Sequence, residues 1–144
     1  MNKFIAVFRL IRVKQWIKNF FVVIPFILSM KFLQFNLADY CNLVIGYAAF
    51  CLISSAVYIF NDLQDLEEDR KHPTKKNRPI VSGEISTSFA LILGIILAAS
   101  SLILVYKFFN AAALMVIIAY LIKNLIYSFK VKHFAIFDVM FISL

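Results

Sequence analysis

Residues 86–106 have the sequence STSFALILGIILAASSLILVY, a run without a single charged side chain. A helix of about 20 apolar residues is long enough to cross the hydrocarbon core of a bilayer. Ser86 is a candidate N-cap of this helix, because its hydroxyl can accept a hydrogen bond from a free N–H of the first turn. Gly94 and Ala98 are small residues one helical turn apart, which lets a neighbouring helix approach closely. The run therefore predicts a transmembrane helix.

Other apolar runs of similar length lie at residues 19–36, 40–60 and 110–128, and a fifth begins at Phe134 and reaches Leu144. As a helix, the fifth run would rise only about 16 Å, which is about half of a bilayer core. The sequence therefore predicts an all-α integral membrane protein: a transmembrane helix bundle with about four full spans and a truncated fifth.

The composition excludes a soluble or disordered chain. Of the 144 residues, 62% are hydrophobic and only 16% are charged, whereas soluble domains carry about 25% charged residues. The net charge of +7 raises the question of nucleic-acid binding, which depends on neutralising phosphates with clustered bases. Here the bases lie in short blocks between apolar runs, as in the cytoplasmic loops of membrane proteins. We expect membrane lipid, and no nucleic acid, as the surroundings of this chain.

The distribution of lysine and arginine also predicts orientation. Residues 2–14 place Phe4 and Phe8 on one face with basic residues around it, as in an amphipathic helix that lies at the membrane interface. With the N-terminus inside, 13 of the 15 basic residues lie on the cytoplasmic side and only Lys31 and Lys107 lie outside. Because cytoplasmic loops are enriched in basic residues, we expect a multi-pass protein of the cell membrane with a cytoplasmic N-terminus.

Residues 61–85 form a predicted cytoplasmic loop rich in aspartate, which begins NDLQDLEEDRKHPTKKNRPIVSG. A helix continuing out of the membrane would place Asp62, Asp65 and Asp69 on one face, since they are spaced i, i+3 and i+7. Carboxylates crowded in this way repel one another unless a cation neutralises them. An all-oxygen set suits Mg²⁺, which takes one or two protein carboxylates and completes its shell with water and phosphate oxygens.

A basic cluster follows these acids directly: Arg70, Lys71, Lys75, Lys76 and Arg78. An acidic stripe beside a basic cluster is what a Mg²⁺–diphosphate ligand requires, because carboxylates hold the metal while cationic side chains hold phosphate oxygens. The spacing alone is equally compatible with a solvated juxtamembrane turn in which the opposite charges pair with each other.

The motif Asn61-Asp62-x-x-Asp65-x-x-x-Asp69 resembles the first aspartate-rich motif of the UbiA superfamily of intramembrane prenyltransferases. The resemblance is closest to the polyprenyl-phosphate (decaprenyl-phosphate) phosphoribosyltransferase branch. Three further segments carry it: RVKQWIKN at 12–19, HPTKKNRPIVSG at 72–83 and YSFKVKH at 127–133. The resemblance covers essentially the whole chain, as the N-terminal part of a single domain over residues 1–144.

The resemblance implies half of a nine-helix bundle around a central cavity, with Mg²⁺ as the cofactor. Asn61, Asp62, Asp65 and Asp69 would hold Mg²⁺ and the donor diphosphate, with the three aspartates as the metal ligands and catalytic residues. Lys75 and Arg78 would neutralise the leaving group, and Arg12 and Lys18 would meet a lipid or donor phosphate. The family's tyrosine–lysine pair would correspond to Tyr127 and Lys130, although the spacing here is Tyr-x-x-Lys and Lys132 is an alternative.

The implied reaction is transfer of 5-phosphoribosyl from phosphoribosyl diphosphate to a polyprenyl phosphate, a step of cell wall lipid biosynthesis. The His72-Pro73-x-Lys75 form of the loop favours it. The alternative is a UbiA-type prenyltransferase that moves an isoprenoid chain from its diphosphate to an aromatic acceptor. A third hypothesis is a non-enzymatic membrane module whose acidic loop binds cations or a partner.

The family's second aspartate motif has no counterpart here. After position 69 the only acidic residues are Glu84 and Asp138, which cannot form a second carboxylate cluster. From the resemblance we therefore expect an incomplete enzyme that is inactive on its own.

Overall fold

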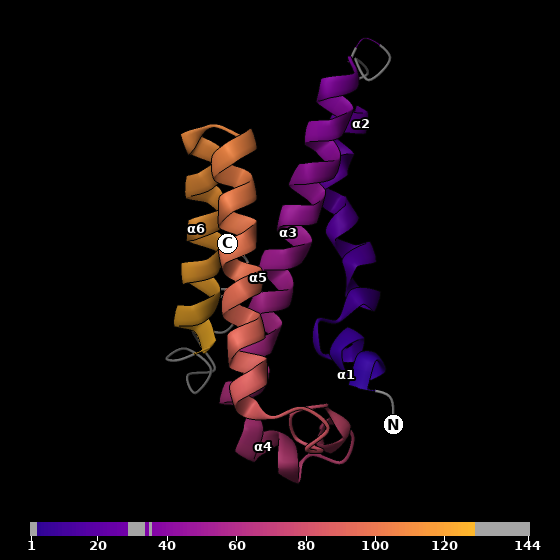
Figure 1. The fold of residues 1–144 in the computed structure, drawn as a ribbon, viewed down its shortest axis with the longest axis vertical. Coiled ribbons are helices and arrows are strands. Elements are labelled where there is room, and N and C mark those ends of the chain that lie inside the picture. Colours follow the sequence, from indigo (N-terminus) through magenta and orange to yellow (C-terminus); the bar gives the residue numbers. More distant parts are fainter. Residues whose placement is uncertain (1–2, 29–33, 35, 129–144) are drawn as a thin grey trace.

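The computed structural model describes residues 3–28, 34 and 36–128, and every regular element within that part of the chain is a helix. The elements are α1 (Lys3–Leu10), the 3-10 helix η1 (Val13–Val23), α2 (Ile24–Leu28), α3 (Leu37–Gln64), α4 (Leu66–Lys71), the 3-10 turn η3 (Lys75–Asn77), α5 (Thr87–Phe108) and α6 (Ala111–Ile126). The long helices α3, α5 and α6 run side by side, and α1 lies at the same end of the bundle as α4 (Figure 1). The all-α prediction is confirmed for the described residues.

Within the described part of the chain, two helices are long and apolar enough to cross a membrane: α3 with 28 residues and α5 with 22. The helix α6 is apolar but has 16 residues. The predicted span at 19–36 is described at 19–28, 34 and 36 and differs from expectation. Residues 19–23 belong to the 3-10 helix η1, and the short α-helix α2 follows at Ile24–Leu28. The run from Phe134 to Leu144 lies outside the described residues.

Pro25 explains where the 3-10 geometry meets α2. A proline has no backbone N–H, so the carbonyl of Phe21 cannot receive an α-helical bond from position 25. Instead it accepts from the N–H of Ile24, one residue earlier. The tighter 3-10 pattern thus supplies the bond that the α-helix would lack at this point.

Three of the helix starts carry side-chain caps. Asn36 and Asp39 form a capping box at α3, in which each side chain accepts from the backbone N–H of the other. The predicted N-cap Ser86 is confirmed, since its hydroxyl accepts from the N–H of Phe89. Asn110 caps α6 in the same way through Ala113. These caps satisfy N–H groups that the helices leave unpaired.

The tightest packing in the bundle joins α3 to α5 through small residues. Gly94 and Ala98 on α5 are buried, and a Cβ at Gly94 would lie 3.0 Å from the ring of Phe60 and 3.3 Å from Ile59. The hydroxyl of Ser101 donates to the carbonyl of Ala49 at 2.7 Å. The predicted close approach at Gly94 and Ala98 is therefore present, and it fixes the end of α3 from which the acidic loop continues.

Gly94→Leu should lower the free energy of unfolding by about 1–3 kcal/mol, because the added side chain meets α3 with no free volume. Helix propensity acts in the opposite direction, since Leu is the better helix former. Ala99→Leu is the matched control, because Ala99 lies on the exposed face of the same helix. The measurement is the thermal unfolding midpoint in detergent, and equal midpoints for the two variants would contradict the packing argument.

Candidate active site

The turn between α1 and η1 has an unusual backbone. Arg12 has φ 55° and ψ 46°, in the left-handed region, and is the one described non-glycine residue with a positive φ. For a residue with a Cβ this conformation costs about 1–2 kcal/mol. The surrounding contacts must therefore hold it, and they come mainly from α3.

A set of hydrogen bonds attaches η1 to α3. The buried hydroxyl of Ser55 lies 2.7 Å from the carbonyl of Ile11 and accepts from Nε1 of Trp16 at 3.0 Å. The hydroxyl of Tyr47 donates to the carbonyl of Trp16 at 2.9 Å. Asn19 donates to the hydroxyl of Ser54 at 2.8 Å. These bonds surround the strained turn and set the direction in which the Arg12 side chain leaves it.

Arg12 reaches the buried carboxylate at the end of α3. Asp62 is 2% exposed, and its Oδ1 accepts from Nη2 of Arg12 at 2.5 Å and from Nη1 of Arg78 at 3.0 Å. The guanidinium of Arg12 also lies 4.5 Å from the ring centroid of Tyr58, within the range of a cation–π interaction. Asp62 is thus held between cations from two distant parts of the sequence.

The helix does not continue straight through the aspartate motif. α3 ends at Gln64, Asp65 lies at the junction with non-helical ψ, and α4 begins at Leu66. Asp69 on α4 is 1% exposed, accepts from Nη1 of Arg78 and lies 3.6 Å from Nζ of Lys75. The expected single helical face is therefore replaced by a bend, and Asp62 and Asp69 converge on the same arginine.

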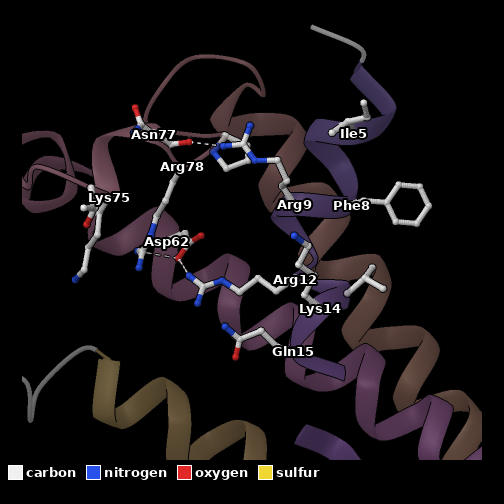
Figure 2. A pocket seen from close by; sticks show the side chains of 13 residues that line it. Ile5, Phe8, Arg9, Arg12, Lys14, Gln15, Asp62, Lys75, Asn77 and Arg78 are labelled. Carbon is white, nitrogen blue, oxygen red and sulfur yellow. Dashed lines mark hydrogen bonds and ion pairs between the residues drawn. The ribbon is translucent and has the colours of Figure 1, made fainter. Parts of the chain in front are cut away.

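A cleft of about 710 Å³ lies beside these groups. Figure 2 shows Asp62 between Arg12 and Arg78, with Lys75 and Asn77 on the loop side and α1 opposite. Basic and apolar side chains make up most of the lining of the cleft, which consists of Ile5, Phe8, Arg9, Arg12, Val13, Lys14, Gln15, Asp62, Thr74, Lys75, Asn77, Arg78 and Pro79. Such a cleft suits an anion that also carries carbon groups.

Arg9 connects the two walls of the cleft. It donates to the carboxylate of Glu84 at 3.1 Å and to the carbonyl of Asn77 at 2.6 Å, so α1 is tied to the loop that carries Arg78 (Figure 2). On the same helix, Phe4, Ile5 and Phe8 are exposed while Ala6 and Leu10 are buried. An interfacial position of α1 stays a prediction.

Three other residues predicted for the site are described and do not line the cleft. Asn61 accepts from the hydroxyl of Ser128 at 2.5 Å, which joins the ends of α3 and α6. Tyr127 is half-buried at the C-terminal cap of α6. Lys18 is exposed on η1 and is not part of the cleft lining. Lys130 lies outside the described residues.

The donor set fits Mg²⁺ with two protein ligands. Among the described residues, no three acidic, histidine or cysteine side chains form a group that could hold a metal. Asp62 and Asp69 nevertheless bond to the same nitrogen of Arg78, so their oxygens lie within reach of one small cation. Mg²⁺ commonly takes one or two carboxylates, with water and phosphate filling the remaining positions.

Several residues of the site were missed from the sequence, and one pattern could have found those on α3. Tyr47, Cys51, Ser55, Tyr58 and Asp62 recur every three or four positions along a largely apolar helix. This spacing places them on one face. A polar stripe along a membrane helix indicates the side that meets other protein groups, which here are η1 and Arg12. Arg9 and Glu84 carry no comparable signal.

Comparison with known proteins identifies a matching family and several similar proteins. Residues 22–144 match the UbiA prenyltransferase family. The decaprenyl-phosphate phosphoribosyltransferase of Mycolicibacterium smegmatis is 35% identical over 135 residues, which is 92% of this chain and 42% of that protein. The protein of the same name from Mycobacterium tuberculosis is 33% identical over 144 residues, covering 99% and 47%. A protoheme IX farnesyltransferase of Leptospira biflexa is 44% identical over 59 residues, covering 41% and 21%. The chain thus spans less than half the length of these relatives.

Ser55→Ala should loosen η1, because it leaves the indole N–H of Trp16 and the carbonyl of Ile11 without their partner. An unpaired buried polar group costs about 1–3 kcal/mol. We expect faster amide hydrogen exchange over residues 13–23 and a lower unfolding midpoint. Ser100→Ala, on α5, is the control. Unchanged exchange over residues 13–23 would show that Ser55 does not hold this segment.

Proposed function

Because the chain belongs to the UbiA prenyltransferase family, we propose that it carries the diphosphate-binding site of a Mg²⁺-dependent transferase. The reaction would move 5-phosphoribosyl from phosphoribosyl diphosphate to a polyprenyl phosphate. The convergence of Asp62 and Asp69 with Arg12, Lys75 and Arg78 beside the cleft carries this proposal. The choice of substrates is supported by similarity to the two decaprenyl-phosphate phosphoribosyltransferases over more than nine-tenths of this chain.

The proposed roles follow from charge. Asp62 and Asp69 would provide oxygens to Mg²⁺, with Asn61 and Asp65 beside them at the mouth of the site. When bound, the metal would neutralise charge that develops on the departing diphosphate. Lys75 and Arg78 would donate to phosphate oxygens, and Arg12 would hold Asp62 in place while meeting substrate phosphate. Lys18, Tyr127 and Lys130 remain proposed substrate contacts.

The chemical step would be a substitution at the anomeric carbon of the ribose. An oxygen of the lipid phosphate forms the new bond to that carbon, while the bond to diphosphate breaks and the leaving group takes the electron pair. Preorganised cations stabilise such a leaving group better than water does, since they need no reorientation during the reaction. The apolar wall of Ile5, Phe8 and Val13 would help to exclude water that competes with the acceptor.

Prenyl transfer to an aromatic acceptor is the second candidate. The similarity of 59 residues to a protoheme IX farnesyltransferase, at 44% identity, favours it. Both reactions release diphosphate, so the same Asp62–Asp69–Arg78 arrangement serves either one. The two functions differ in the donor, so an assay of which donor is consumed distinguishes them.

Labelled donors offered to the full-length protein in membranes would separate the candidates. We expect transfer from phosphoribosyl diphosphate to polyprenyl phosphate, and a reduction of about 10²–10³-fold in turnover for Asp62→Asn and for Asp69→Asn, the size typical of losing one electrostatic contact in an active site. Glu67→Gln is the matched control, because Glu67 is exposed on α4 and pairs with Arg70. Consumption of prenyl diphosphate alone would favour the second candidate. Unchanged turnover in both aspartate variants would indicate that the acidic loop has a structural role and takes no part in catalysis.

The proposed orientation places the cleft on the cytoplasmic side of the cell membrane, as the basic residues predict. Single cysteines introduced into a Cys41→Ser, Cys51→Ser background test it. Lys107→Cys, at the end of α5, should react with a membrane-impermeant maleimide in intact cells. Lys76→Cys, exposed in η3, should react only after permeabilisation. The reverse pattern would invert the topology.

A further inference from the structure

The two buried carboxylates are already neutralised by the chain itself. Asp62 bonds to Arg12 and Arg78, and Asp69 bonds to Arg78 with Lys75 nearby. Two negative charges thus face three positive ones within the described residues. The arginine and lysine side chains therefore offset the repulsion expected between the two aspartates.

A bare divalent cation would meet two obstacles at this pair. Nη1 of Arg78 bonds to both Asp62 and Asp69, so an ion that bridges the two carboxylates must displace it. The ion would also add two positive charges to a cluster that already carries a surplus. Like charges this close repel one another strongly, because the protein screens them less than water does. The arrangement therefore opposes the metal alone.

A metal that arrives with a diphosphate removes both obstacles. The anion carries more negative charge than the metal carries positive, so the excess positive charge of the cluster becomes an attraction. The guanidinium of Arg78, once released from the carboxylates, has a planar set of donors that matches phosphate oxygens. Arg78 is only partly buried, with 24% of its side chain exposed, and lines the cleft, so it can turn toward a ligand there.

We propose that Arg78 is a specificity-determining residue that makes the Asp62–Asp69 pair bind a divalent cation only together with a diphosphate. The inference rests on the proposed function, in which this cleft takes a metal–diphosphate donor. By linkage, the factor by which diphosphate tightens metal binding equals the factor by which metal tightens diphosphate binding. Arg78 would produce this mutual tightening, because it competes with the metal for Asp62 and Asp69 when diphosphate is absent and binds the diphosphate when it is present.

Mn²⁺ binding followed by electron paramagnetic resonance tests this without any turnover. The full-length protein, in nanodiscs of zwitterionic lipid, is titrated with Mn²⁺ in the presence and absence of inorganic diphosphate, and free Mn²⁺ is corrected for the complex formed in solution. In the wild type, diphosphate should raise the Mn²⁺ affinity by about tenfold or more. In Arg78→Gln, Mn²⁺ alone should bind about tenfold more tightly, and the enhancement by diphosphate should largely disappear.

Two further variants test whether the effect requires a guanidinium at position 78 or only a positive charge. Arg70→Gln removes the same charge from α4, where Arg70 pairs with exposed Glu67, and should leave both Mn²⁺ affinities unchanged. Arg78→Lys keeps the charge but loses the planar fork, so bare Mn²⁺ should bind as weakly as in the wild type while the enhancement by diphosphate falls. Arg78→Lys and the two wild-type titrations also decide the matter if Arg78→Gln does not fold.

The outcomes distinguish this inference from the proposed function. If Arg78→Gln binds bare Mn²⁺ no better than the wild type, or if wild-type affinity is the same with and without diphosphate, the specificity role of Arg78 is wrong and the donor site can still stand. If the wild type binds no Mn²⁺ in either titration, or if Asp62→Asn and Asp69→Asn leave binding intact, the metal site fails and the inference fails with it.

Discussion

The bridge from Arg78 to Asp62 and Asp69 is the interaction on which the end of the molecule around α4 depends. Its partners come from the last turn of α3, from α4 and from the loop before α5. Removing one partner from a buried ion pair costs about 3–5 kcal/mol, because the other charge is left unpaired. Without Arg78, two buried carboxylates would face each other at the bend, and the conformation of the acidic loop would lose its main constraint.

The sequence predicted the parts of the fold that follow from length and periodicity. The 86–106 run became α5 with Ser86 as its cap, and Gly94 and Ala98 lie at the contact with α3. The 19–36 run was not predictable in the same way, because hydropathy measures the apolar length and not the helix type. There the 3-10 helix η1, held to α3 by polar contacts, meets the short α2 next to Pro25, in place of one regular helix.

The candidate site was predictable in composition but not in its contacts. Asp62, Asp69, Lys75 and Arg78 share a short stretch, for which the two hypotheses were a ligand site and a self-paired turn. The pairing of opposite charges is found, whereas the ligand site stays a prediction. The ion pairs are present, and so is a cleft beside them. Helical spacing could not reveal the bend at Asp65, because nothing in the spacing shows that Asp62 and Asp69, on either side of it, pair with Arg78 from the following loop.

Arg12 links this site to the membrane helices. Its left-handed backbone is unfavourable for an arginine. It is maintained by Ser55, which lies two helical turns before Asp62 on α3 and bonds to Trp16 and to the carbonyl of Ile11. Any change in how η1 packs on α3 must therefore alter the direction of the Arg12 guanidinium, and with it the charge around Asp62. Since Arg12 and Arg78 share the same carboxylate oxygen, a shift of one changes the position available to the other. The polar stripe of α3 thus does more than attach a neighbouring segment: it sets how strongly Asp62 is held in its ion pairs.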